Sequence, residues 1–159
     1  MWAMRARVAL PALVLLTVLA LAPREAAALP PGLVTKSSPY DVAQTLDRLA
    51  DLLKKNGFNI ETRIDLRAIA KVGGETIAPA QLLVVSNPTF DAGFMKSQRA
   101  VGLELPLRIL AYEDTGGHVR LTYLDPDQLA QNYNINNQPV AVQHMAQLLD
   151  QLTDEAIKP

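Results

Sequence analysis

The chain of 159 residues is 49% apolar and 19% charged, which suits a single domain with a hydrophobic core. Its formal net charge at pH 7 is −1, so bulk charge excludes a protein built to hold nucleic acid or another polyanion. The sequence has no cysteine and only two histidines, so we expect no disulfide, no structural zinc site and no other cofactor.

The first 28 residues have the organisation of a secretory signal peptide. Two arginines precede a mostly apolar, uncharged run over residues 8–22. This run is shorter than the roughly 20 residues that span a bilayer, which disfavours a membrane anchor. Ala26 and Ala28 supply the small residues of a cleavage site, which predicts a mature chain that begins at Leu29 and has no membrane span. Cleavage leaves 12 basic and 15 acidic residues, and the product would be periplasmic or secreted.

Residues 32–57 predict a strand followed by an amphipathic helix. The first six residues alternate between two faces. Ser38 and Pro39 are suited to begin the helix, with the serine oxygen accepting a free backbone N–H. Apolar residues then recur at helical spacing and form one stripe, which comprises Val42, Leu46, Leu49 and Leu53. Gly57 can adopt the left-handed conformation that ends a helix.

Residues 58–86 predict two strands with a short helix between them. The first strand, over 58–65, alternates with a period of two. This period assigns four side chains to one face: Phe58, Ile60, Thr62 and Ile64. Residues 66–72 predict a short helix, and residues 81–86 form an apolar run that is typical of a central strand. Asn87 and Pro88 end this strand.

The rest of the chain predicts a helix, a hairpin and two further helices. The helix over residues 89–101 would turn three side chains inward: Phe90, Phe94 and Met95. The hairpin follows over residues 103–123, a short helix begins at Asp125, and a longer helix covers residues 140–157. This order predicts one α+β domain over residues 29–159, with two layers: a mixed sheet that includes the C-terminal hairpin, and helices packed on it.

The hairpin has one favoured register, with residues 113–117 as its turn. In this register one face collects the apolar side chains, namely Leu107, Ile109, Ala111, Val119, Leu121 and Tyr123. The other face carries a mixed set: Arg108, Leu110, Tyr112, His118, Arg120 and Thr122. Two interpretations of this mixed face stay open, a surface that binds a partner or an anionic ligand, and the solvated side of an antiparallel sheet.

The sequence contains no nucleophile elbow, phosphate loop, dinucleotide fingerprint or zinc-protease pair of histidines. His118, beside a Gly-Gly turn, and His144, on the last helix, are typical of surface residues. The junction Ser86-Asn87-Pro88 joins a strand to a helix, where backbone N–H groups can face an anion. A helix cap explains the same residues, and we favour that interpretation.

Three stretches together carry a family resemblance. The runs LLVVSNPTFDAGFM, VGLELPLRILAYED and VRLTYLDPDQLAQNY resemble the family called domain of unknown function 302, over roughly residues 33–150. The resemblance implies a small domain with a fold like that of the TATA-binding protein, often dimeric and without an established activity. Members commonly carry a histidine where this chain has Leu66, and a glycine where it has Ser86. A chemical role for that histidine could not be retained here, which weighs against an enzyme.

Two functions of different classes follow from these observations. The first is an exported, non-catalytic module that forms a homodimer or binds an unknown small molecule or protein through Arg108, Arg120 and their neighbours. The alternative is a small enzyme in which Asn87, Arg108 and Tyr112 surround an anionic metabolite, with arginine as the electrostatic clamp and tyrosine as an acid. Convergence of those three residues in a pocket would favour the enzyme, and a flat face would favour the module.

Overall fold

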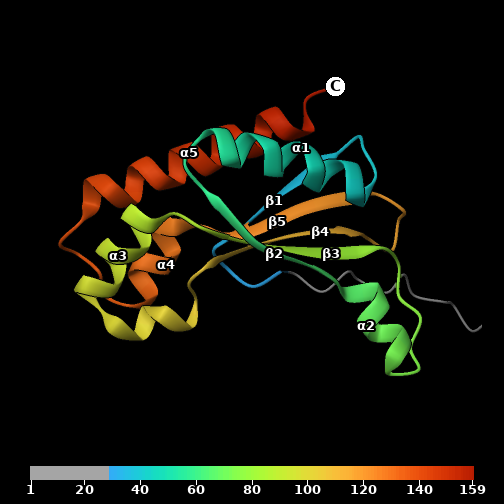
Figure 1. Ribbon diagram of the computed structural model, residues 1–159, viewed down its shortest axis with the longest axis horizontal. Helices are drawn as coiled ribbons and strands as arrows, with labels where there is room; N and C mark the ends of the chain where they lie inside the picture. The colour runs from blue at the N-terminus through green and yellow to red at the C-terminus, as the bar shows by residue number, and fades with distance from the viewer. Residues whose placement is uncertain (1–28) are drawn as a thin grey trace, which may run out of the picture.

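The computed structural model describes residues 29–159, which form a five-stranded sheet with helices packed on it (Figure 1). The predicted signal peptide, residues 1–28, lies outside the described residues. The strands are β1 (Leu33–Ser38), β2 (Asn59–Asp65), β3 (Ala80–Ser86), β4 (Leu107–Glu113) and β5 (Val119–Leu124). The helices are α1 (Val42–Lys55), α2 (Leu66–Val72), α3 (Pro88–Ser97), the short 3₁₀ helix η1 (Arg99–Leu103), α4 (Pro126–Asn132) and α5 (Pro139–Ile157). The predicted α+β class is confirmed.

The sheet has the order β1-β5-β4-β3-β2, and each neighbouring pair is antiparallel. The sheet is therefore antiparallel throughout rather than mixed as expected. Strands β1 and β2 do run in the same direction, as a strand, a helix and a strand in succession suggest. They lie at opposite edges of the sheet, however, because β5, β4 and β3 are inserted between them.

Helices α1 and α5 lie side by side across one face of the sheet (Figure 1). The predicted apolar stripe of α1 is buried in the core between the helices and the sheet. It comprises Val42, Leu46, Leu49 and Leu53. Gly57 follows the helix with a φ of 81°, as predicted for the residue that ends it. Helix α5 contributes Met145, Leu149 and Leu152 to the same core. These contacts make one hydrophobic core between two layers.

The cap of α1 differs from the prediction. Asp41, not Ser38, is the capping residue, and its Oδ1 accepts the N–H of Gln44 at 2.7 Å. The hydroxyl of Ser38 lies 2.6 Å from that of Thr45. The helix begins three residues later than expected because the aspartate carboxylate provides a stronger acceptor at the positive helix end than the serine hydroxyl.

Strand β2 contains a bulge that reverses its alternation. Ile60 pairs with Val85 and Thr62 pairs with the next residue, Val84, so that Glu61 has no partner of its own. Ile60 therefore packs against the core under the helices, whereas Thr62 and the residues after it change face. The prediction that four residues of this strand share one face is wrong for this reason.

The hairpin of β4 and β5 adopts the predicted register. Ile109 lies opposite Tyr123 and Ala111 opposite Leu121, and all four side chains are buried. Asp114 organises the turn, because its Oδ1 accepts the N–H of Gly116 at 2.8 Å and that of His118 at 3.0 Å. The register thus follows from the apolar pattern, and the turn follows from one aspartate.

Helix α3 is shorter than predicted and is followed by the separate helix η1. Phe90 and Phe94 are buried as expected, whereas Met95 is 42% exposed. The prediction for Met95 is wrong because residues four apart share a helix face, while the next residue along is rotated by roughly 100°.

Candidate functional site

The sheet face opposite α1 and α5 is not covered by a helix in residues 29–159, except at the end where α2 lies (Figure 1). We call this surface the open face. By strand pairing it contains Thr35, Ser37, Thr62, Ile64, Leu82, Val84, Arg108, Leu110, Tyr112, Arg120 and Thr122.

The centre of the open face is apolar. Leu82 of β3 lies opposite Leu110 of β4, and both are half-buried, as is Val84 beside them. Two polar side chains on this face bond each other within the sheet, since the hydroxyl oxygens of Thr35 and Thr122 are 2.9 Å apart and hydrogen-bonded. The open face is therefore not the fully polar surface that contact with solvent alone would favour.

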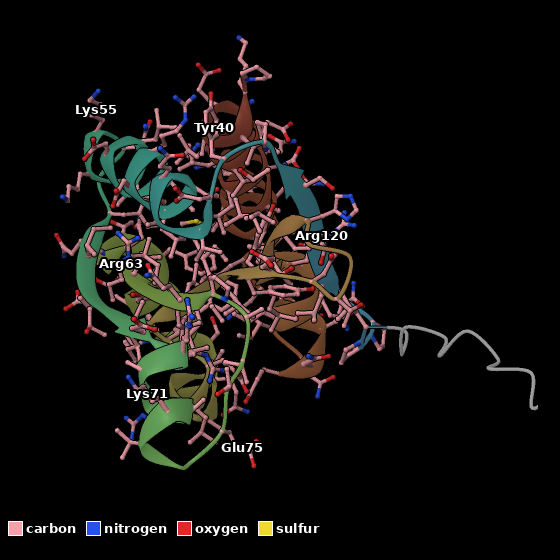
Figure 2. All side chains as sticks on the ribbon, turned by 90° about the vertical axis from the view of Figure 1, so that its right-hand side faces the viewer. Tyr40, Lys55, Arg63, Lys71, Glu75 and Arg120 are labelled. Atoms are coloured by element: carbon pink, nitrogen blue, oxygen red, sulfur yellow. The ribbon has the colours of Figure 1, made fainter. Side chains whose placement is uncertain are left out.

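Arg120 lies at the β1 side of the open face (Figure 2). Its Nε donates to Oδ2 of Asp114 at 2.8 Å, and its Nη1 donates to the hydroxyl of Ser37. The backbone N–H of His118 and then the Arg120 guanidinium lower the pKa of Asp114 from 3.8 to about 2. Arg120 is thus held in place by the turn and by β1.

Arg108 and Tyr112 project from β4 on the same face. The guanidinium of Arg108 pairs with the carboxylate of Glu104, and half of the arginine side chain, 52%, is exposed. Tyr112 lies between Ala80 of β3 and Arg120 of β5. His118, at the end of the hairpin, is exposed, and its Nδ1 is 3.5 Å from Asp114 Oδ1.

Asn87 lies at the end of β3 and caps α3, and its Oδ1 accepts the N–H of Phe90 at 3.1 Å. A cavity of about 30 Å³ borders Arg108, and its lining includes neither Asn87 nor Tyr112. This volume holds water-sized occupants and excludes a metabolite. The structure thus assigns Arg108, Tyr112 and Arg120 to one surface and Asn87 to a helix cap, while the catalytic role suggested for them stays a prediction.

Two features are absent from residues 29–159, a cluster of metal-binding side chains and a helix that could span a membrane. This part of the chain holds no group of three or more histidine or acidic side chains placed to bind a metal ion. None of its helices has both the length and the apolar character needed to cross a bilayer.

Two charged residues with unusual surroundings were not identified from the sequence, Lys36 and Asp91. Lys36 lies on the helix side of β1, and Asp91 is buried in the first turn of α3. The sequence does carry a signal for Asp91, which stands one residue after Phe90 and three before Phe94, both predicted to be inward. A carboxyl that close to two core residues on a helix is a candidate for burial.

The family model described as "Domain of unknown function DUF302" matches residues 34–156 of this chain. The "Fluoride-specific ion channel FluC 1" of Brucella suis is 41% identical over 115 residues, which are 72% of this chain and 45% of that protein. The "Fluoride-specific ion channel FluC 1" of Brucella abortus is also 41% identical, over 43% of its length. This chain therefore spans less than half the length of these curated relatives.

A solved structure shares the fold. The crystal structure of an uncharacterized conserved DUF302 protein from Bacillus stearothermophilus superposes with a TM-score of 0.72, and the match covers 80% of this chain and 99% of that one. The two sequences are 20% identical, so this likeness concerns the fold alone.

Proposed function

This chain belongs to the DUF302 family, a domain of unknown function, and we propose that it is an exported, non-catalytic module that pairs with a second copy through its open face. The signal peptide expected over residues 1–28 supports export. The absence of catalytic motifs from the sequence and the small size of the cavity beside Arg108 favour a module over an enzyme.

The observation that carries this proposal is the apolar centre of the open face. Leu82, Val84 and Leu110 are half-buried rather than buried, so each retains part of its surface within residues 29–159. Contact with a second copy would remove this surface from water, which contributes roughly 25 cal/mol for each Å² of apolar area. The same contact would explain why aliphatic residues occupy the outer side of two inner strands.

The two ends of the hairpin are suited to self-pairing because each carries both signs of charge. Arg108 lies beside Glu104, and Arg120 lies beside Asp114. In a two-fold arrangement a surface meets its own copy, so arginines of one molecule can approach carboxylates of the other. Helix α2, at one end of the open face, has no buried residue, and its Val72 is 91% exposed.

Sedimentation equilibrium over a range of protein concentrations tests the proposal. We expect a monomer–dimer equilibrium in the wild type and, for Leu110→Glu, a dissociation constant at least 100-fold weaker, because a carboxylate would lie in the desolvated centre. The matched control is Val140→Glu on α5, where the native side chain is 78% exposed and the change should leave association intact. A wild type that is monomeric at every concentration would contradict dimerisation.

A second candidate partner is a fluoride-specific ion channel, favoured by the names of the Brucella relatives. In those proteins the region related to this chain is less than half of the polypeptide. We propose that this chain can associate with a channel of that kind.

The test uses the part of the Brucella suis relative outside its 115 matched residues, purified in detergent and titrated with labelled protein. Saturable binding with a Kd below about 10 μM, lost in Leu110→Glu and kept in Val140→Glu, is expected. Binding that is absent, or equal for both variants, argues against this partner at the open face.

A further inference from the structure

Asp91 combines burial with an unsatisfied oxygen. Asp91 is only 7% exposed, and Phe90 and Phe94 on the same helix are also buried. The two phenyl rings contact each other, with centroids 4.1 Å apart. Oδ1 of Asp91 is buried and has no hydrogen-bond partner among the described residues. A buried polar atom without a partner is destabilising, and more so when it carries a charge, so this environment favours the protonated carboxyl.

The charged side chain that acts on Asp91 is Glu61, at the bulge of β2. Glu61 accepts a hydrogen bond from the hydroxyl of Ser86 on β3. The second half of α3 contacts a neutral side chain, that of Gln138. Its amide N–H donates to the carbonyl of Gly93 at 2.6 Å. An ionised Asp91 would therefore be repelled by the negative charge of Glu61.

Helix α3 has separate attachments at its two ends. Asn87 caps the first turn, where the N–H of Asp91 donates to the Asn87 carbonyl at 2.8 Å. Gln138 holds the later turns through Gly93 and also donates to the hydroxyl of Ser97 at 2.8 Å. The first turn can consequently open while the rest of the helix stays attached.

We propose that Asp91 is a proton-binding group that controls the first turn of α3: protonated, it keeps this turn packed on the core, and ionised, it lets the turn open. This inference does not depend on the partner of the open face. It implies that an exported chain would expose Phe90 and the end of the sheet beside it when the surrounding pH rises.

The direction of the effect follows from the surroundings of the carboxyl. Burial raises the pKa of Asp91 from 3.8 to about 6, Glu61 adds to this increase, and the backbone of Asn87 opposes it. A raised carboxyl pKa means that the packed state holds its proton more tightly than the open state does. The packed turn is therefore favoured at low pH and loses stability as the pH rises from about 4 to about 6.

Hydrogen exchange measured by NMR tests the proposal on the wild-type protein. Protection factors of the Phe90 and Asp91 amides should fall by up to about 100-fold between pH 4 and pH 7, while that of Leu49 in α1 stays constant. The carboxyl carbon of Asp91 should titrate with a midpoint near 6. A midpoint below about 4.5 would overturn the proposal without any variant.

Substitutions separate the proton from the packing. Asp91→Asn should make the protection of Phe90 independent of pH, and Glu61→Gln should move the wild-type transition to lower pH because it removes the like charge. The matched control is Asp127→Asn, an exposed acid in the first turn of α4, which should leave the transition unchanged. Persistence of the pH-dependent loss of protection in Asp91→Asn would contradict the role of Asp91.

Discussion

Arg120 and Asp114 connect the two strands of the hairpin to its turn, with Nε of the arginine 2.8 Å from Oδ2 of the aspartate. The same aspartate accepts backbone N–H groups of Gly116 and His118 through its other oxygen. One carboxylate therefore both shapes the turn and fixes the direction in which Arg120 crosses the open face toward Ser37.

Replacing Arg108 and Arg120 with alanine should weaken the proposed self-association. Exposed charge pairs contribute up to about 1 kcal/mol each, so the double variant should raise the dissociation constant by about 10-fold. Sedimentation equilibrium at low and high salt measures this change, and salt should weaken the wild-type dimer in the same direction. Arg99→Ala, an exposed arginine of η1, is the matched control. If the double variant associates as tightly as the wild type, the two arginines do not contribute to the interface.

Asp114 predicts a specific loss of stability in acid. Its pKa is lowered from 3.8 to about 2, so its stabilising contribution is present above about pH 4 and disappears as the pH falls toward 2. The amide oxygen of Asn can still accept the two turn N–H groups, and Asp114→Asn therefore removes the charge together with the hydrogen bond that Arg120 donates to Oδ2. Urea unfolding should give a wild type that is more stable than this variant at pH 6, and the difference in free energy of unfolding should become small by pH 2. A stability difference that stays constant over this range would argue against the ionised carboxylate as its cause, and exposed Asp51→Asn serves as the control.

Periodicity in the sequence predicted the parts of the fold that depend on an uninterrupted repeat. The α1 stripe and the register of β4 and β5 are both read from apolar spacing, and both are confirmed. The bulge at Glu61 could not be read in this way, because one inserted residue changes the face of the following residues without changing local composition.

The sequence also predicted part of the candidate site, namely the part that depends on the register of the hairpin. Arg108, Tyr112 and Arg120 share a face because they belong to the hairpin, whose register the sequence determines. The environments of Lys36 and Asp91 depend on contacts with segments far away in the chain, namely α5 and the β2 bulge. Such contacts leave no trace in the local pattern around Lys36. For Asp91 the spacing to Phe94 signals burial, but nothing in the local pattern signals the charge of Glu61.

The predicted signal peptide has a direct chemical test. Mass spectrometry of the exported protein should find a chain that begins at Leu29, because Ala26 and Ala28 fit the small pockets of a signal peptidase. Ala28→Arg should block cleavage and leave the full-length precursor at the membrane. The matched control is Pro30→Ala, which lies beyond the predicted cleavage site and should leave cleavage unchanged. Isolation of a soluble chain that still begins at Met1 would contradict export by this route.

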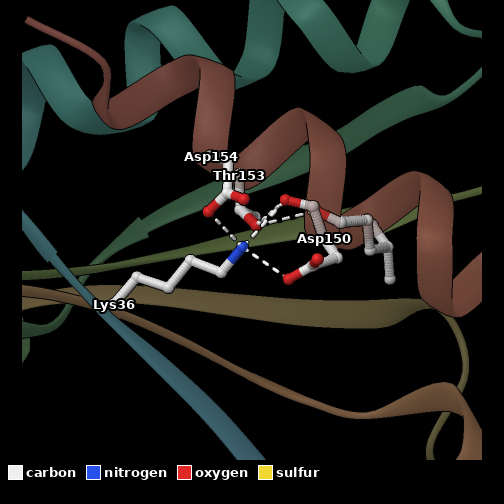
Figure 3. A network of polar contacts seen from close by, with 5 residues as sticks. Lys36, Asp150, Thr153 and Asp154 are labelled. Atoms are coloured by element: carbon white, nitrogen blue, oxygen red, sulfur yellow. Dashed lines mark hydrogen bonds and ion pairs between the residues drawn. The ribbon is translucent and has the colours of Figure 1, made fainter.

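Lys36 connects the edge strand β1 to α5 (Figure 3). Its Nζ donates to Oδ1 of Asp150 at 2.7 Å, to the Asp150 carbonyl at 2.8 Å, and to Oδ1 of Asp154 at 2.6 Å. Burial by itself lowers the pKa of Lys36, and the hydrogen bonds with the two aspartates outweigh it and raise the pKa above 10.5. The ammonium thus joins strand and helix where the helix crosses the sheet edge.

Lys36→Met should reduce the free energy of unfolding by about 1–2 kcal/mol, because it keeps the apolar stem and removes three charge-assisted hydrogen bonds. Two of these go to the largely exposed carboxylates of Asp150 and Asp154, and one goes to the Asp150 backbone carbonyl. Urea unfolding at pH 7 measures the loss, and Lys55→Met, at the exposed end of α1, is the matched control (Figure 2). Since the raised pKa favours the charged lysine in the folded state, its contribution is complete below pH 10.5 and declines as the pH rises above that value. The stability difference between wild type and Lys36→Met should therefore narrow in strong alkali. A difference that is negligible at pH 7 would mean that packing of α5 on α1, rather than this ammonium, determines where α5 lies.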